Sequence, residues 1–142
     1  MSESRQFVVC NSLHAVEARR LQKEYYRHYD TSLRGLMETR GIDPHEFMEF
    51  VHDISHEALV PDPKLAEAIA ALPGKRYVLT NGSRAHAERC AVSLGLGDLF
   101  HDIFDVAQAD FIPKPKPELY NSFIRHVGVK PEGSAMFEDL AR

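Results

Sequence analysis

The segment RYVLTNGSR, residues 76–84, decides the fold that the sequence predicts. Residues 77–79 have the apolar and β-branched character of a strand buried on both faces of a parallel sheet. Residues 80–83 interrupt this strand with a hydroxyl, an amide and a glycine, and a helical pattern follows. Side-chain donors and backbone N–H groups at the start of a helix attract anions, so this turn is a candidate phosphate site. An ordinary turn in which Asn81 or Ser83 caps the helix explains the same residues.

The composition is that of a globular protein of one domain, or of one small domain with a partner lobe. A net charge of -4 and an isoelectric point near 6.0 argue against binding to nucleic-acid polymers, because no basic stripe is available to neutralise phosphates. Nucleotides remain candidates as small substrates. Cys10 and Cys90 are too few for a disulfide framework or a zinc site. The sequence shows no signal peptide and no apolar run of membrane length, which predicts a cytoplasmic protein with free thiols.

The first half of the chain is predicted to be mainly helical, after a short apolar strand at residues 7–10. Residues 15–37 carry one apolar helical face, and helix packing explains its tyrosines better than contact with a ligand does. Gly41 is expected to end this segment, and Asp43 and Pro44 to start a second helix over about residues 45–54. The apolar positions are Leu21, Tyr25, Tyr29, Leu33 and Leu36 in the first segment, and Phe47, Phe50, Val51 and Ile54 in the second.

Two histidines follow each other at helical spacing near the end of this half. His52 and His56 are four residues apart, which on a continuous helix would let them share a metal ion. No third ligand is apparent nearby in the sequence, so an ordinary helix face is the preferred interpretation. The PDP segment at residues 61–63 restricts the backbone and predicts a hinge after this helical lobe.

Strands and helices alternate in the second half of the chain. Such alternation is typical of an α/β fold with a parallel sheet. The expected helices cover residues 65–72, 85–94 and 118–127, and the expected strands cover residues 77–79, 103–106 and 135–137.

Two loops of this half carry residues suited to chemistry. In FIPKPKPE, residues 111–118, prolines stiffen a loop that presents Lys114 as a fixed cation, although a solvated surface lysine explains the same pattern. In FED, residues 137–139, two adjacent carboxylates at the tip of a strand offer the hard oxygen ligands that Mg²⁺ prefers. Two acids that open a helix are the simpler explanation of that pair.

Taken in order, these motifs resemble the second, third and fourth motifs of the haloacid dehalogenase-like hydrolase superfamily. They are LTNG at residues 79–82, KPKP at residues 114–117 and FED at residues 137–139. EARRLQKEYY at residues 17–26, LRGLM at residues 33–37, the PDP segment and TNGSRAHA at residues 80–87 are similar to the pyrimidine 5′-nucleotidase branch, which has a helical cap. The resemblance covers roughly residues 16–142.

The resemblance implies Mg²⁺-dependent hydrolysis of a small phosphomonoester, a nucleoside 5′-monophosphate, by attack of an aspartate on phosphorus. Thr80 would hydrogen-bond the transferred phosphoryl group, helped by the backbone of Asn81 and Gly82. Lys114 would stabilise the developing charge.

The resemblance also implies a metal site and an architecture. Glu138 and Asp139 would hold Mg²⁺ directly or through water. Residues 1–14 and 59–142 would form an incomplete Rossmann-like parallel sheet core, and residues 15–58 a partial helical cap that closes over the substrate. Self-association through the exposed sheet edges is expected.

The first motif of the superfamily, Asp-x-Asp, occurs nowhere in the 142 residues. If residues 7–13 stand in its place, Val8 replaces the nucleophile and Cys10 replaces the general acid and base. Valine cannot attack phosphorus, and cysteine is a poor substitute for a carboxylate bound to Mg²⁺. The sequence ends at Arg142, where the superfamily continues into a further βα unit, so a chain truncated at its C-terminus or divergent at both ends is expected. We therefore expect an impaired hydrolase, and a noncatalytic phosphate-binding or partner-binding protein is the alternative.

Overall fold

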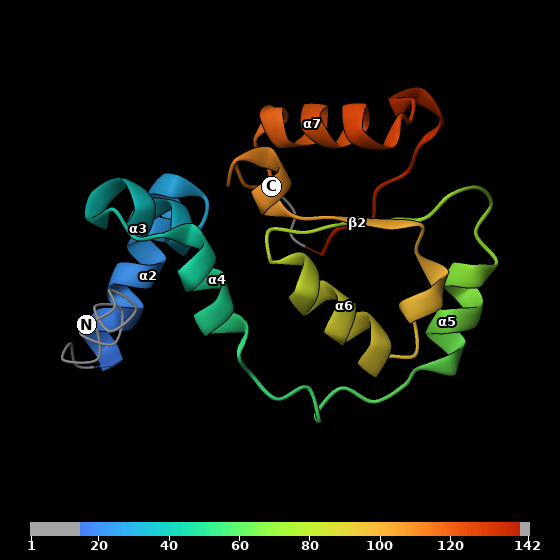
Figure 1. Cartoon of the computed structure of the whole chain (residues 1–142), viewed down its shortest axis with the longest axis horizontal. Helices are drawn as coiled ribbons and strands as arrows, with labels where there is room; N and C mark the ends of the chain where they lie inside the picture. Colours follow the sequence, from blue (N-terminus) through green and yellow to red (C-terminus); the bar gives the residue numbers. More distant parts are fainter. Residues whose placement is uncertain (1–14, 140–142) are drawn as a thin grey trace. The chain divides into compact units, whose positions relative to one another are not determined.

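The computed structural model describes residues 15–139 of the chain. The strand expected at residues 7–10 lies outside the described residues, together with the placement of Val8 and Cys10. The chain divides into two compact units, Met1–Ile54 and Ser55–Arg142, and each is described by itself (Figure 1).

The described part of the first unit is helical. The apolar face expected to continue over residues 15–37 is interrupted at Asp30, whose φ of 65° is left-handed. Thr31 then starts a new helix by accepting the backbone N–H of Arg34. The expectation of one helical segment is therefore wrong, and the observed helices are α2 (Ala15–Tyr29), α3 (Ser32–Arg40) and α4 (Pro44–His52).

The helix ends in this unit follow the capping residues that the sequence offers. Gly41 ends α3 with a φ of 62°, and Asp43 caps α4 with Pro44 in the first turn, so these two predictions are confirmed. Because α4 ends at His52, the continuous helix that would let His52 and His56 share a metal ion is not present.

Tyr25 packs α2 against α3, and its residue surface is only 7% exposed. A Cβ atom at Gly35 would lie 2.5 Å from Cγ of Tyr25, so only glycine allows this approach. The hydroxyls of Thr39 and Tyr25 form a hydrogen bond of 2.8 Å. Helix packing therefore accounts for this tyrosine.

The second unit contains a parallel pair of strands with helices around it. Its elements are α5 (Pro63–Ala70), β1 (Tyr77–Leu79), α6 (Arg84–Ser93), β2 (Asp102–Phe104) and α7 (Pro117–Val127), with short 3-10 helices η2 (Gly97–Leu99), η3 (Val106–Ala109) and η4 (Pro131–Gly133). β1 and β2 pair in parallel from Tyr77 with Asp102 to Leu79 with Phe104. Figure 1 shows α7 on one side of β2 and α6 on the other. The fold is the predicted α/β class, and the described residues supply two strands of a Rossmann-like parallel sheet.

The core of this unit lies between β2 and α7. Phe104 is 2% exposed, Leu119 is fully buried, and the ring of Phe123 stands edge-on to that of Phe104 at 5.7 Å. The three residues of β1 are only half-buried, so the expectation that both faces of this strand are buried is wrong. The reason is that, among the described residues, β1 pairs with β2 alone and is an edge of the sheet.

Two strand predictions need correction. Residues 135–137 form no strand, and Phe137 is 81% exposed. A strand requires a neighbouring backbone to satisfy its polar groups, and no described strand pairs with this segment. β2 ends at Phe104 rather than at Val106, because Asp105 turns the chain and caps η3. The predicted helices of this unit agree with the structure to within two residues at each end.

Candidate phosphate site

The side-chain amide of Asn81 joins two turns that are far apart in the sequence. Its Oδ1 accepts the backbone N–H of Lys114 at 2.7 Å, and its Nδ2 donates to the carbonyl of Lys114 at 3.4 Å. Both contacts are made to the backbone, so they fix the point from which the lysine side chain leaves. The turn after β1 and the proline-rich loop at residues 111–118 therefore lie together.

The Lys114 side chain brings in a third loop. Its Nζ donates to Oε2 of Glu138 at 2.5 Å, and the two side chains are 20% and 30% exposed. We call the residues that gather around the turn after β1 the strand-end cluster. They are Thr80, Asn81, Gly82, Lys114 and Glu138. Residues from all three predicted motifs thus gather in one place.

Thr80 is positioned by the strand pair. Its N–H donates to the carbonyl of Phe104 at 3.0 Å, which continues the β1–β2 ladder by one residue. Its Oγ1 accepts the N–H of Gly82 at 2.9 Å. Because a hydroxyl that accepts a hydrogen bond still carries a proton, Thr80 is able to donate to an anion in this turn.

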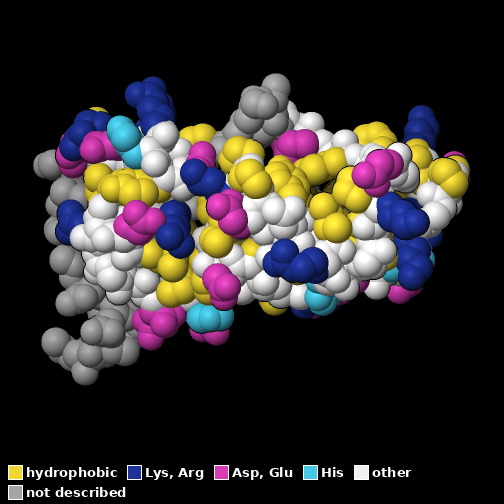
Figure 2. All heavy atoms as spheres, turned by 90° about the horizontal axis from the view of Figure 1, so that it is seen from above, with side chains coloured by type: hydrophobic (Ala, Val, Ile, Leu, Met, Phe, Trp, Pro, Cys, Tyr) yellow, Lys and Arg dark blue, Asp and Glu magenta, His cyan; other side chains and the backbone are white. Residues whose placement is uncertain are grey.

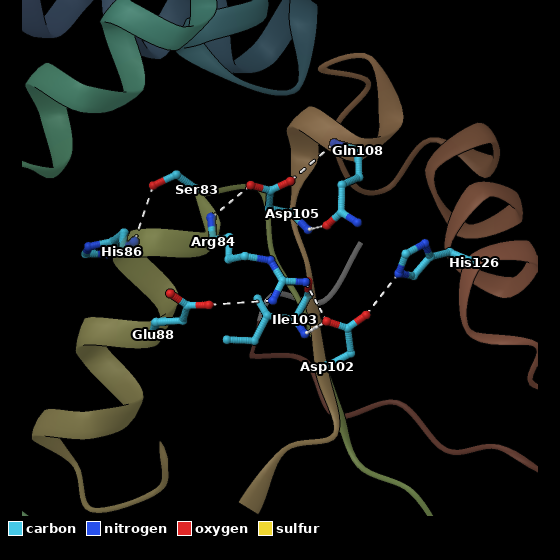
Figure 3. Close-up of polar contacts among 9 residues, drawn as sticks. All are labelled: Ser83, Arg84, His86, Glu88, Asp102, Ile103, Asp105, Gln108 and His126. Atoms are coloured by element: carbon cyan, nitrogen blue, oxygen red, sulfur yellow. Dashed lines mark hydrogen bonds and ion pairs between the residues drawn. The ribbon is translucent and has the colours of Figure 1, made fainter. Parts of the chain in front are cut away.

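Some backbone N–H groups at the start of α6 already donate hydrogen bonds within the protein. The N–H of Arg84 donates to Oδ2 of Asp105 at 2.9 Å, and the N–H of His86 donates to Oγ of Ser83 at 3.4 Å (Figure 3). Ser83 is therefore the helix cap, whereas Asn81 holds Lys114. An anion bound in this turn would depend more on the side chains of Thr80 and Lys114 than on these helix N–H groups.

Comparison with known proteins identifies the family of this chain. Residues 8–142 match the family described as haloacid dehalogenase-like hydrolase. The chain belongs to this family. Phosphate metabolism protein 8 of Saccharomyces cerevisiae is 32% identical to it over 138 residues, which cover 87% of this chain and 43% of the relative. The chain thus spans less than half the length of that relative. The resemblance to the superfamily is confirmed, and the pyrimidine 5′-nucleotidase branch stays a prediction.

Hydrolases of this family generally use Mg²⁺, and the two acids after residue 137 can be tested for their fit to it. Mg²⁺ is commonly held by one or two carboxylates beside water and phosphate oxygens. Both residues are exposed, and Glu138 is engaged with Lys114 and accepts the N–H of Asp139 at 3.2 Å. No third His, Cys, Asp or Glu groups with this pair in the part of the chain that the structure describes. The donor chemistry fits Mg²⁺, with Asp139 as the more accessible ligand.

A second charged network lies at the opposite end of the strand pair (Figure 3). The guanidinium of Arg84 donates to Oδ1 of Asp102 at 2.5 Å and also to the carbonyl of Ile103, and Nε2 of His126 lies 2.9 Å from Oδ2 of Asp102. The hydrogen bonds from Arg84 and then from His126 lower the pKa of Asp102 from 3.8 to about 2. The network joins α6, β2 and α7, and its role is structural.

Sequence reasoning missed this network because its members are distant along the chain. Asp102 is 18 residues from Arg84 and 24 from His126. The one local signal is the spacing of Arg84 and Glu88, which form an i,i+4 ion pair at 3.5 Å. That spacing predicts an exposed helix pair and says nothing of the strand that Arg84 reaches.

The surface outside the cluster is mixed in character. An open hollow of about 590 Å³ is lined by residues 58–65 and Leu94, none of which belongs to the strand-end cluster. On the face drawn in Figure 2, Lys and Arg side chains are interspersed with Asp and Glu side chains. No helix among residues 15–139 is long and apolar enough to cross a membrane.

Proposed function

We propose that the strand-end cluster binds the phosphate group of a small phosphomonoester. The observation that carries this proposal is the pair of hydrogen bonds from Asn81 to the backbone of Lys114, which holds a cation beside the turn of Thr80. An ammonium group and a hydroxyl are suitable donors for a phosphate dianion. Membership of a hydrolase family and a relative named for phosphate metabolism support the same ligand.

The reaction that we propose is Mg²⁺-dependent hydrolysis of nucleoside 5′-monophosphates. Lys114 stabilises the negative charge that develops on the transferred phosphoryl group, and Thr80 donates to one of its oxygens. Asp139 would hold Mg²⁺ directly and Glu138 through water, and the bound ion would screen the charge of the phosphate. The choice of a nucleotide rests on the similarity of residues 17–26 and 80–87 to the pyrimidine 5′-nucleotidase branch.

We further propose that turnover by this chain is impaired, since no Asp-x-Asp occurs in its 142 residues. The slowest uncatalysed reactions, such as hydrolysis of phosphate monoesters, require accelerations of up to about 10²¹. Lys114 and Thr80 can position and stabilise a phosphoryl group, but neither replaces a carboxylate that attacks phosphorus. The same observation favours the second candidate, a protein that binds phosphate esters and does not hydrolyse them.

Phosphate release and equilibrium binding, measured together, test these two candidates. The substrates are a panel of nucleoside 5′-monophosphates and p-nitrophenyl phosphate with Mg²⁺, and Asp139→Ala is assayed beside the unmodified chain. Saturable binding together with slow phosphate release, with the release lost in D139A, would favour the impaired hydrolase. Binding without phosphate release would favour the noncatalytic protein. A kcat in the ordinary range of about 1–10³ s⁻¹ would contradict the impairment. Absence of binding would contradict the site itself.

Glu138→Gln tests the two roles given to this carboxylate. Without metal, Glu138 competes with phosphate for Lys114, so E138Q should bind inorganic phosphate about two- to fivefold more tightly, as expected for a partly exposed ion pair. With Mg²⁺ present, loss of a metal-holding carboxylate should remove that gain. Titration calorimetry with and without Mg²⁺ measures both effects, and Glu132→Gln in η4 is the control. Weaker metal-free binding in E138Q would contradict the competition.

A further inference from the structure

A histidine and a cysteine on α6 meet a second histidine from the segment that follows α4. His86 and Cys90 lie one helical turn apart, and Sγ of Cys90 is 3.6 Å from Nε2 and 4.0 Å from Nδ1 of His86. Nε2 of His56 lies 3.2 Å from Nδ1 of His86. One ligand atom from each of the three residues can be chosen so that all lie within 4.8 Å of one another, and all three side chains are partly buried.

These distances resemble the edges of a tetrahedral zinc site. Zinc lies about 2.0–2.1 Å from histidine nitrogen and about 2.3 Å from cysteine sulfur. Tetrahedral angles then put two nitrogens about 3.4 Å apart and a nitrogen and a sulfur about 3.6 Å apart. One imidazole ring offers a single ion only one nitrogen, and through Nδ1 of His86 the nitrogen–nitrogen edge is 3.2 Å and the sulfur–nitrogen edge is 4.0 Å. The sulfur–nitrogen edge would have to shorten by about 0.4 Å to reach the tetrahedral value.

We propose that His56, His86 and Cys90 bind a zinc ion, with water in the fourth position. Two imidazoles and a thiolate are ligands that suit zinc and do not suit Mg²⁺, which prefers oxygen. The site is therefore separate in chemistry from the carboxylates Glu138 and Asp139. On binding, the thiol of Cys90 loses its proton to solvent, and each histidine must be neutral.

The charges around His86 bear on the proposed site. The charge of Arg89 and the positive end of the α6 dipole oppose a bound cation, so the thiolate of Cys90 is needed to offset them. Without metal, the same three side chains form a hydrogen-bonded cluster.

The proposed ion would fasten the segment at residues 55–62 to α6. This segment is already attached near the end of α6, where the N–H of Asp62 donates to the carbonyl of Leu94 at 3.2 Å. Zinc between His56 and His86 would add an attachment near its start. Because the N–H of His86 also bonds to Ser83, the ion would stabilise the beginning of α6 directly after the turn that carries Thr80.

Metal analysis of the intact chain tests the proposal. After incubation with Zn²⁺ and dialysis, about one equivalent should remain bound, and Co²⁺ in its place should give a sulfur-to-cobalt charge-transfer band. His56→Ala, His86→Ala and Cys90→Ser should each weaken Zn²⁺ binding at least tenfold, since even the loss of an outer-shell partner has an effect of that size. Cys90→Ser should also abolish the band.

Matched variants keep this test decisive. Cys10→Ser removes the other thiol and His28→Ala removes an exposed histidine of α2, and both should retain the metal and the band. His56 lies outside the helices, so H56A is the variant least able to disturb folding, and circular dichroism checks each protein. Zn²⁺ should raise the Tm of the unmodified chain and not that of C90S. No retained metal in the unmodified chain, a band that survives in C90S, or a band lost in C10S would overturn the proposal.

Discussion

At the amino end of β2, Arg84 and His126 converge on Asp102, whereas at the opposite end of the strand pair Lys114 reaches Glu138 across two loops. The first network joins regular elements that pack on the sheet. The second depends on Asn81, whose amide holds the loop of the lysine by its backbone. The difference indicates that charge at the amino end stabilises the fold, and we propose that charge at the carboxyl end serves a ligand.

Phe104 is the last residue of β2 and contacts residues of both ends, so its loss should disturb both. The residue is 2% exposed, its carbonyl accepts the N–H of Thr80, and its ring lies 5.3 Å from that of His126. Phe104→Ala should lower the free energy of unfolding by about 3–5 kcal/mol. Denaturant unfolding measures this loss, with Val92→Ala, which is 70% exposed, as a control that should change little. A loss below about 1 kcal/mol in F104A would show that this core does not support the two ends.

Asp102→Asn should distinguish the roles of the two ends, because it should lower stability and leave phosphate binding unchanged. It removes the charge held between Arg84 and His126, which should cost about 1.5 kcal/mol after allowance for partial exposure of the group. The folded-state pKa of Asp102 is lowered to about 2 from 3.8, so its stabilisation is present above about pH 4 and is lost as the pH falls toward 2.

The difference in Tm between D102N and the unmodified chain measures this effect across pH. It should be constant near neutral pH and shrink as the pH falls from about 4 to about 2. Taking the difference removes the contributions of other acids, such as Glu17, whose pKa is also lowered by Arg20. A difference that grows in acid, or weaker phosphate binding in D102N, would contradict the assignment.

Asn81→Ala should have the smallest effect on stability of these three changes. It removes the contacts to the backbone of Lys114, which should cost about 1 kcal/mol and should also weaken phosphate binding. Asn81→Asp is the matched variant, because it keeps an acceptor for the N–H of Lys114 and loses the longer contact to the carbonyl. Thermal unfolding should rank the unmodified chain above N81D and N81D above N81A. Equal stability of N81A and the unmodified chain would remove Asn81 from its positioning role.

The two ends also differ in how far the sequence predicts them. Thr80 and Lys114 could be singled out because each lies in a recognisable motif, and the capping residues Gly41 and Asp43 predicted helix ends correctly. The hydrogen bonds of the Asn81 side chain to the backbone of Lys114 were not predicted. An asparagine that caps a helix and one that holds a neighbouring loop look the same in the sequence. The contacts of Asp102 depend on how α6 and α7 pack on β2, which no local pattern encodes.

Two further features show where sequence patterns stop being informative. The run at residues 135–137 has strand character, yet a strand forms only where a neighbouring backbone pairs with it. His86 and Cys90 carry a visible i,i+4 spacing, but their partner His56 is 30 residues from His86. A count of two cysteines in the chain therefore could not indicate a site of mixed ligands.

The most direct test of the proposed phosphate site is the binding of inorganic phosphate by Lys114→Ala and Lys116→Ala. The two lysines share one loop, and Lys114 is held by Asn81 and paired with Glu138. Titration calorimetry should show at least about tenfold weaker binding in K114A, or about 1.4 kcal/mol, and little change in K116A, with both proteins as stable as the unmodified chain. Equal phosphate affinity in K114A and the unmodified chain would contradict the assignment of the strand-end cluster as the phosphate site.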